Sequence, residues 1–283
     1  MRIHLLQHEA QAVSTNVLAW AAQNGHAVTR TDVLEADVLP DAGDFDLLVV
    51  AGGPQHIWEK DKNPWLGNEK KLLAAAAAAG KHVLGICLGA QLLAEVLGGR
   101  VFANPLTELG WCAVQLTSAG LTSPLFRGVP ERFTMFQWHS DHFSLPEGVT
   151  RLATSPAAPN QAFADADGRL LGIQFHPDFD CGLIEDMVRS ETEKWPEGPF
   201  VTPRETLLQE TAAIEEPVWL MELLLDNMAQ AMQSSNAPEP RSHQNDDCRD
   251  QSRGLDRGAE ALCSRLAVEE TDNQPRQKAK QVR

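Results

Sequence analysis

The residues best suited to covalent chemistry surround a cysteine in the sequence Gly85-Ile86-Cys87-Leu88-Gly89. Glycines two positions either side of a nucleophile are typical of a sharp strand-to-helix turn, where a Cβ atom would clash. A helix N-terminus favours the thiolate form of such a cysteine. The Leu88 amide, in the first helical turn, is free to donate to an oxyanion. We therefore predict that Cys87 is a nucleophile that attacks a carbonyl carbon.

A cysteine nucleophile needs a base, and His176 is the predicted one. It follows an apolar strand pattern at residues 170–175 and precedes a proline. The carboxyl ends of parallel strands meet at one edge of a sheet, so His176 and Cys87 can meet there. The rival bases are His139 and His142, and the weaker rivals are His4, His8 and His56.

The histidine in turn needs an acceptor that fixes its orientation. Asp178, two residues after His176, is the predicted third member of a triad. Asp180 is the alternative partner, and a Cys87–His176 pair without a third member is the remaining one.

The first half of the chain carries the pattern of a scaffold for these residues. Apolar runs predict strands at residues 3–7, 26–31, 46–51 and 82–86, and helical patterns cover residues 11–24, 68–79 and 88–97. This alternation of strand and helix predicts an α/β fold with a parallel sheet and right-handed crossovers.

The second half has a different pattern, with short strands separated by turn residues. The predicted strands are residues 114–116, 133–137, 151–153, 161–164 and 170–175, and the predicted closing helices are residues 203–209 and 219–232. The segments 161–164 and 170–175 are expected to form a hairpin.

Four segments resemble, in the same order, motifs of the class I (triad) glutamine amidotransferases. They are Val50-Ala51-Gly52-Gly53-Pro54, the nucleophile segment 85–91, Trp138-His139-Ser140-Asp141, and the segment 172–177 that ends in His176-Pro177. The resemblance covers about residues 3–190. Pro64-Trp65-Leu66 with Glu69 resembles the stand-alone branch similar to the glutaminase domain of GMP synthase.

This resemblance implies a three-layer, flavodoxin-like fold, with a mostly parallel central sheet and added antiparallel strands. It assigns the second oxyanion donor to the Gly53 amide, and Gly52 has no Cβ to obstruct a substrate. Relatives usually carry glutamate where Asp178 stands, and many carry glycine in place of Ser140. These two departures leave the reach of the carboxylate and the shape of the pocket open.

The resemblance also implies the residues that bind the α-amino and carboxylate end of glutamine. Gln91 lies one helical turn beyond Cys87, on the same helix face. The other predicted contacts are backbone groups of Trp138, Ser140 and Asp141.

Composition excludes several other classes of function. The net charge of −15 argues against a nucleic-acid or anionic-membrane surface. No secretory signal or membrane-spanning run is found, and five scattered cysteines favour a reducing cytoplasm. No metal-ligand spacing, P-loop or other nucleotide motif is present, so we expect neither metal nor cofactor.

Composition also divides the chain near Gln233. All 7 tryptophans and all 10 phenylalanines precede that residue, and the acidic and basic residues beyond it are equal in number. A segment so poor in large apolar side chains cannot offset its ordering entropy. We expect a catalytic domain at residues 1–233 and a disordered polar tail at residues 234–283.

Three functions fit these observations. The first is a glutaminase that supplies ammonia to a separate synthetase subunit. The second is a stand-alone γ-glutamyl peptidase or hydrolase that uses the same Cys87, His176 and Asp178. The third is a non-catalytic binding or regulatory module, against which the intact Cys87 and His176 argue.

The tail is expected to be dispensable for chemistry and for stability. A chain that ends at Gln233 should keep the melting temperature and the turnover of the full chain, because the tail lacks aromatic side chains that could pack on the domain. Thermal denaturation and ammonia release from glutamine measure the two properties. A drop of several degrees in melting temperature would contradict this prediction.

Overall fold

A computed structural model describes residues 1–9, 14–35, 38–59, 61–214 and 219–235. The predicted tail lies outside these residues, apart from Ser234 and Ser235. The search for membrane-spanning helices covered the described residues and found none long and apolar enough.

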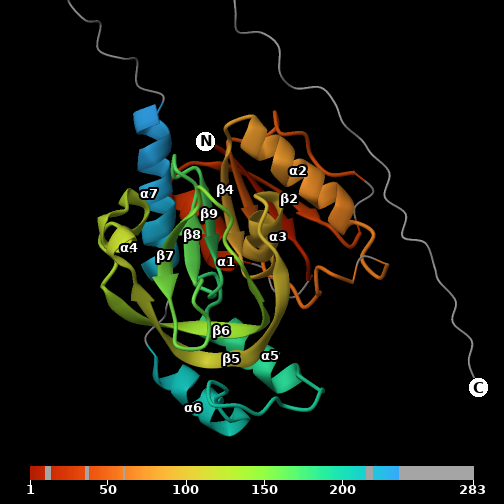
Figure 1. Cartoon of the computed structure of the whole chain (residues 1–283), viewed down its shortest axis with the longest axis vertical. Coiled ribbons are helices and arrows are strands. Elements are labelled where there is room, and N and C mark those ends of the chain that lie inside the picture. Colours follow the sequence, from red (N-terminus) through yellow and green to blue (C-terminus); the bar gives the residue numbers. More distant parts are fainter. Residues whose placement is uncertain (10–13, 36–37, 60, 215–218, 236–283) are drawn as a thin grey trace, which may run out of the picture. The chain divides into compact units, whose positions relative to one another are not determined.

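The described strands form one nine-stranded sheet whose first part is parallel, as Figure 1 shows. The order is β2-β1-β3-β4-β9-β8-β7-β5-β6. The strands from β2 to β9 in this order pair in parallel. They are β1 (Arg2–Gln7), β2 (Ala27–Asp32), β3 (Leu47–Val50), β4 (His82–Ile86) and β9 (Leu170–Ile173).

The remaining strands extend the sheet by antiparallel pairing. They are β5 (Val101–Leu116), β6 (Arg132–Phe143), β7 (Thr150–Thr154) and β8 (Ala162–Ala164). β5 and β6 are much longer than predicted, and the register of their pairing shifts between Ala103 and Glu108. The predicted hairpin of residues 161–164 and 170–175 is confirmed as β8 and β9.

Helices cover both faces of the parallel part, because its strands are apolar on both sides. Leu47 and Val49 of β3 pack in one core with α1 (Thr15–Gln23) and α7 (Trp219–Ser235). Leu48 and Val50 pack in another core with α2 (Leu66–Ala78) and α3 (Leu88–Val96). The alternation of side chains along a strand thus produces the three layers that the sequence predicts.

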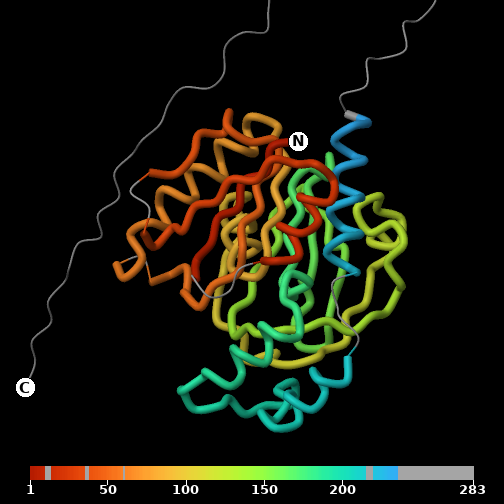
Figure 2. Tube along the Cα trace, turned by 180° about the vertical axis from the view of Figure 1, so that it is seen from behind, coloured from red at the N-terminus to blue at the C-terminus, as the bar shows by residue number. Residues whose placement is uncertain are grey.

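A third core joins the long strands to the helices that follow the sheet. Leu109 and Phe136 pack with α5 (Cys181–Ser190) and α6 (Arg204–Ala213). Figure 2 shows these two helices, in teal, at the end of the sheet that β5 and β6 form. The sequence pattern did not reveal α5, α4 (Ser118–Thr122) or the 3-10 turn at Pro124–Phe126.

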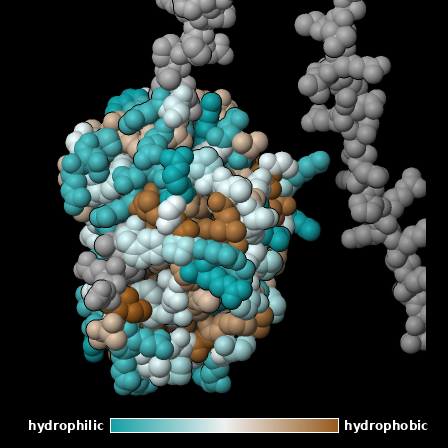
Figure 3. All heavy atoms as spheres, turned by 90° about the vertical axis from the view of Figure 1, so that its left-hand side faces the viewer, coloured by the Kyte–Doolittle hydropathy of each residue, from teal (hydrophilic) through white to brown (hydrophobic). Residues whose placement is uncertain are grey.

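Hydrophobic side chains form patches on the surface of the described residues (Figure 3). Figure 3 shows one face, on which these patches lie between hydrophilic residues. Such a mixed surface is ordinary for a folded globular domain.

Close backbone contacts join the β4–α3 turn to its neighbours. A Cβ atom on Gly85 would lie 2.5 Å from the carbonyl oxygen of Gly89. A Cβ atom on Gly89 would lie 2.2 Å from the carbonyl oxygen of Val50, at the end of β3. Neither contact leaves room for a side chain, so α3 can start this close to the sheet only with glycine at both positions.

Gly89→Ala should therefore destabilise the domain by about 1–3 kcal/mol, because the added methyl group overpacks against backbone. Gly67→Ala is the matched control, since Gly67 lies in α2 with open space around its Cβ position. That control should be neutral or stabilising, as alanine favours a helix over glycine by about 1 kcal/mol. Urea denaturation measures both changes. Equal effects of the two substitutions would contradict the proposed packing constraint.

Candidate active site

Cys87 occupies a strained turn between β4 and α3. It is the N-cap residue of α3, and its φ of 51° is the one positive value among the described non-glycine residues. Its amide donates to the carbonyl of Ile173 at 2.8 Å, which ties the turn to the end of β9. Strain held in this way is a frequent property of functional sites.

His176 lies beside this turn because β9 is the parallel neighbour of β4. Its amide donates to the carbonyl of Phe136 at 2.9 Å, and its ring stacks on Phe179 with the centroids 4.2 Å apart. A Cβ atom on Gly52 would lie 2.7 Å from Cε1 of His176 and 3.4 Å from Cβ of Cys87. The structure thus brings three of the predicted site residues into one cluster.

The electrostatic surroundings of His176 favour its protonated form. Burial alone would lower its pKa, but the charges of Cys87 and Asp178 and its hydrogen bond to Asp178 raise the pKa to about 10. Opposite charges within a few ångströms have this effect on any ionisable group. An imidazolium next to a thiolate is the arrangement that activates a cysteine nucleophile.

Asp178 holds the His176 ring through Nδ1. Nδ1 of His176 lies 3.2 Å from Oδ1 of Asp178, and Oδ2 accepts a hydrogen bond from Oγ of Ser14 at 2.9 Å. The alternative partner, Asp180, is the N-cap of α5 and accepts from the amide of Leu183 at 2.7 Å. The geometry therefore favours Asp178, and the shorter aspartate does reach the histidine.

The start of α1 supplies two residues that sequence reasoning missed. Besides the contact of Ser14, Nδ2 of Asn16 donates to the carbonyl of Pro177 at 2.7 Å. Both contacts fix the segment from His176 to Asp178. Ser-Thr-Asn at residues 14–16 is a typical helix N-cap signal, but the predicted helix began at residue 11 and left this signal unused.

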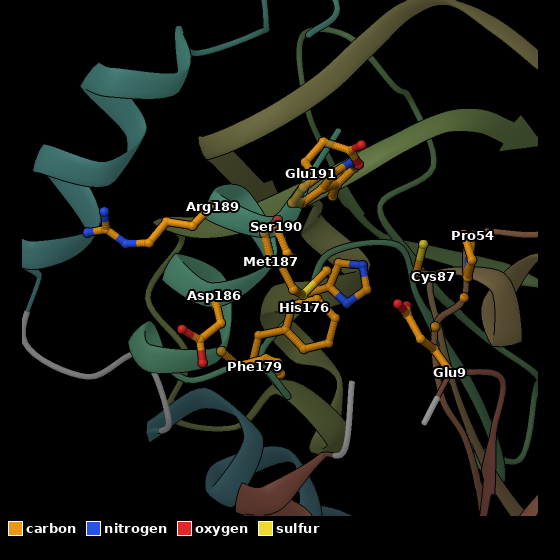
Figure 4. A pocket seen from close by; sticks show the side chains of 14 residues that line it. Glu9, Pro54, Cys87, His176, Phe179, Asp186, Met187, Arg189, Ser190 and Glu191 are labelled. Carbon is orange, nitrogen blue, oxygen red and sulfur yellow. Dashed lines mark hydrogen bonds between the residues drawn. The ribbon is translucent and has the colours of Figure 1, made fainter. Parts of the chain in front are cut away.

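A cavity of about 950 Å³ opens at the cluster. Figure 4 shows Cys87 and Pro54 on one side of it, and His176 with Phe179 on the other. Gly52, Gly53 and Trp138 also line the cavity, another wall comes from α5, and the acidic residues Glu9 and Glu191 complete the described lining. Sequence reasoning did not find this wall, since α5 carries no recognisable motif.

The structure places only some of the predicted substrate-binding residues at the cavity. Gly52 and Trp138 line the cavity, whereas Gln91, Ser140 and Asp141 are absent from its described lining. Gln91 is buried and donates to Oε1 of Gln174 at 3.3 Å. Ser140 is exposed, and the Oδ2 atom of Asp141 lies 2.6 Å from Nδ1 of His56.

The two leading rival bases, His139 and His142, are absent from the described lining of this cavity. Nε2 of His139 lies 3.0 Å from Oε2 of Glu108 in a buried pair. His142 is also buried, and burial lowers its pKa to about 4. His176 is the histidine in the described lining of the cavity.

The described residues hold no group of three histidine, cysteine, aspartate or glutamate side chains that could bind a metal ion.

Comparison with known proteins gives a consistent result. The profile of the family "Glutamine amidotransferase class-I" matches residues 9–192. The chain is 33% identical over 198 residues to the glutamine amidotransferase-like protein YfeJ of Salmonella typhimurium, a match that covers 69% of this chain and 82% of YfeJ. It is 37% identical over 132 residues to the GMP synthase of Aeropyrum pernix, which covers 46% of this chain and 24% of that enzyme.

Solved structures share the fold. The crystal structure of SMU.1228c matches with a TM-score of 0.74 at 29% identity, covering 81% of this chain and 100% of that one. A glutamine amidotransferase from Thermotoga maritima matches with a TM-score of 0.68 at 25% identity, covering 82% of this chain and 97% of that one.

The charge environment of His176 leads to a prediction. The His176 imidazole should stay protonated throughout the neutral range, because its pKa is raised to about 10. Asp178→Asn should lower that pKa by about 1–3 pH units, since it removes one of the two charges that favour the imidazolium. A titration of labelled histidine side chains by NMR measures both values. Asp180→Asn is the control and should leave the His176 pKa unchanged; an equal shift in both variants would contradict the assignment.

Proposed function

This chain belongs to the class I glutamine amidotransferase family, and from that membership we propose that it hydrolyses the side-chain amide of glutamine through a γ-glutamyl thioester on Cys87. The observation that best supports this proposal is that Cys87, His176 and Gly52 lie close together at the strained turn that carries Cys87. There, a nucleophile, a proton donor and a side-chain-free approach for a carbonyl group lie together.

The proposed reaction starts with attack of the Cys87 thiolate on the γ-carbonyl carbon. The C=O π electrons move to the oxygen, and the resulting oxyanion accepts hydrogen bonds from the amides of Leu88 and Gly53. Leu88 is the first residue of α3, so its amide has no partner within the helix. The helix N-terminus adds a favourable electrostatic field at the developing charge.

Proton transfer then follows the geometry of His176. Its imidazolium gives a proton to the departing nitrogen as the C–N bond breaks, which releases ammonia and leaves the thioester. The neutral imidazole next takes a proton from water, which attacks the thioester and releases glutamate. Asp178 orients the ring through Nδ1 and stabilises its positive charge in each step.

Two candidate functions differ in what happens to the amide nitrogen that the reaction releases. GMP synthase of Aeropyrum pernix is more than four times longer than its match to this chain, which covers 24% of it. By analogy with such relatives, a separate synthetase subunit would use the ammonia that this chain releases.

The size of the cavity favours the second candidate, a stand-alone γ-glutamyl hydrolase. A volume of about 950 Å³ is at the upper end of the range for drug-sized ligands. It leaves room for a group on the amide nitrogen, which free glutamine does not carry. Both candidates use the same chemistry, and both place the catalytic domain in residues 1–233.

A nucleophile variant tests the proposed chemistry. Cys87→Ala should lower turnover by at least about 10³-fold and leave the fold unchanged, because the substitution removes only the attacking atom. Cys112→Ala is the matched control, since burial raises the pKa of the Cys112 thiol to about 12 and makes it unreactive. A glutamine-like chloroketone should label Cys87 alone, as mass spectrometry of peptides can verify. Labelling of Cys112 or Cys181 would refute the assignment.

A substrate panel distinguishes the two candidates. The wild-type protein is given free glutamine and γ-glutamyl dipeptides or amides, and the release of ammonia and of amine is measured separately. A glutaminase should have the higher kcat/KM on glutamine. A stand-alone γ-glutamyl hydrolase should prefer the larger amides that fill the cavity. Turnover of neither class would refute the proposed function.

A further inference from the structure

The segment Pro64-Trp65-Leu66 with Glu69 has no part in the proposed reaction, yet two of its residues, Trp65 and Glu69, contact a buried histidine. Nε2 of His8 lies 2.9 and 3.1 Å from the two carboxylate oxygens of Glu69. Both side chains are completely buried. The ring of Trp65 lies against the His8 ring, with the centroids 5.2 Å apart.

This pair holds His8 from one side. Nδ1 of His8 is buried and has no hydrogen-bond partner among the described residues. The hydrogen bond from Nε2 to Glu69 is therefore the polar contact that fixes the ring. A hydrogen bond to a carboxylate is roughly twice as strong as one between neutral groups, so Glu69 is a firm anchor.

His8 in turn lies directly against the glycine turn of the proposed oxyanion site. A Cβ atom on Gly53 would lie 2.6 Å from Cβ of His8 and 3.0 Å from Cδ2 of Leu88. Nε2 of Gln55 donates to the carbonyl of His8 at 3.2 Å, which joins the far end of the turn to the same residue. Gly53 is thus enclosed between His8 and the residue that supplies the other oxyanion donor.

The opposite side of the turn faces the reacting groups. There Gly52 contacts His176 and Cys87, as described above. Two successive glycines have more backbone freedom than any other pair of residues, so their peptide orientation depends on what surrounds them. On the side away from the reaction, the surrounding groups are the side chain of Gln55 and His8, which Glu69 anchors.

We propose that His8 and Glu69 are positioning residues that hold the Gly53 amide in the orientation that stabilises the oxyanion. The proposal rests on the proposed function and assigns a role in it to Glu69. Neither side chain lines the described part of the cavity, so both act through the Gly52–Gly53 turn. The contribution is expected in the transition state, because the oxyanion exists only there and in the tetrahedral intermediates.

Glu69→Gln tests this role with little change of shape. Loss of one oxyanion donor lowers kcat by about 10²–10³-fold, and a loosened donor should lower it by at least about 10-fold. KM should stay within about two-fold, since the ground state does not need the donor. Glu95→Gln is the matched control: Glu95, on α3, forms a partly exposed ion pair at 2.7 Å with Lys70 of α2, the helix that also carries Glu69. It should leave kcat unchanged.

Two inhibitors separate positioning from general stability. A γ-glutamyl aldehyde forms a tetrahedral adduct with the Cys87 sulfur, and its oxygen needs the Gly53 amide. Its affinity should fall in Glu69→Gln by the same factor as kcat. Alkylation of Cys87 by iodoacetamide forms no oxyanion and should keep its rate. Unchanged kcat, or a parallel loss of the alkylation rate and melting temperature, would overturn the proposal.

The histidine offers an independent pair of variants. His8→Gln keeps a side-chain amide that can donate to Glu69, whereas His8→Leu leaves the carboxylate buried and unpaired. The glutamine variant should retain more of the wild-type kcat and aldehyde affinity than the leucine variant. Equal losses in the two variants, at equal folded fractions, would count against positioning through this hydrogen bond.

A spectroscopic measurement keeps this test separate from that of the proposed function. The ¹H–¹⁵N resonance of Gly53 should shift or broaden in Glu69→Gln and stay in place in Glu95→Gln. This comparison needs no turnover. A wild-type protein without γ-glutamyl activity would refute the function alone, while an unperturbed Gly53 resonance in Glu69→Gln would overturn the positioning role.

Discussion

The turn that carries Cys87 is the constraint on which the site depends. A backbone with a φ of 51° at a non-glycine residue is unfavourable by itself and persists only where its surroundings fix it. Here the amide of Cys87 is bonded to Ile173 and the Gly89 backbone contacts the Val50 carbonyl. These contacts require β3, β4 and β9 to be adjacent and parallel. The order of the central strands therefore follows from the same geometry that places Cys87 in the lining of the cavity.

The second requirement is a rigid base, and the chain meets it by joining distant segments. Ser14 and Asn16 at the start of α1 bond to Asp178 and to the Pro177 carbonyl. The backbone amide of His176 bonds to β6. Polar contacts in a buried place are stronger than in water and costly to leave incomplete, so such a network fixes one arrangement. The position of His176 thus depends on contacts between residues more than 160 positions apart in the sequence.

The sequence predicted most strands and the main covering helices of the parallel half, because each strand there is apolar on both faces and each helix has a clear end. It did not predict the length of β5 and β6, where polar residues such as Asn104 and Thr107 interrupt the pattern. The proximity of Cys87, His176 and Asp178 was predictable, because Cys87 and His176 lie just beyond the ends of two neighbouring parallel strands. Glu9 and the α5 wall were not, since a cavity wall made by tertiary packing leaves no local signal.

The partners of the histidines explain why one of them is suited to act as a base. His8 and His139 each face a buried glutamate through Nε2, which holds the ring in place, and neither lies in the described lining of the cavity. His142 is buried between aromatic rings, where its charged form is unfavourable. His176 has a carboxylate on one nitrogen and leaves the other side of its ring toward Cys87 and the cavity. All four candidates are histidines. They differ in the side chains that surround each ring and in whether the ring reaches the cavity.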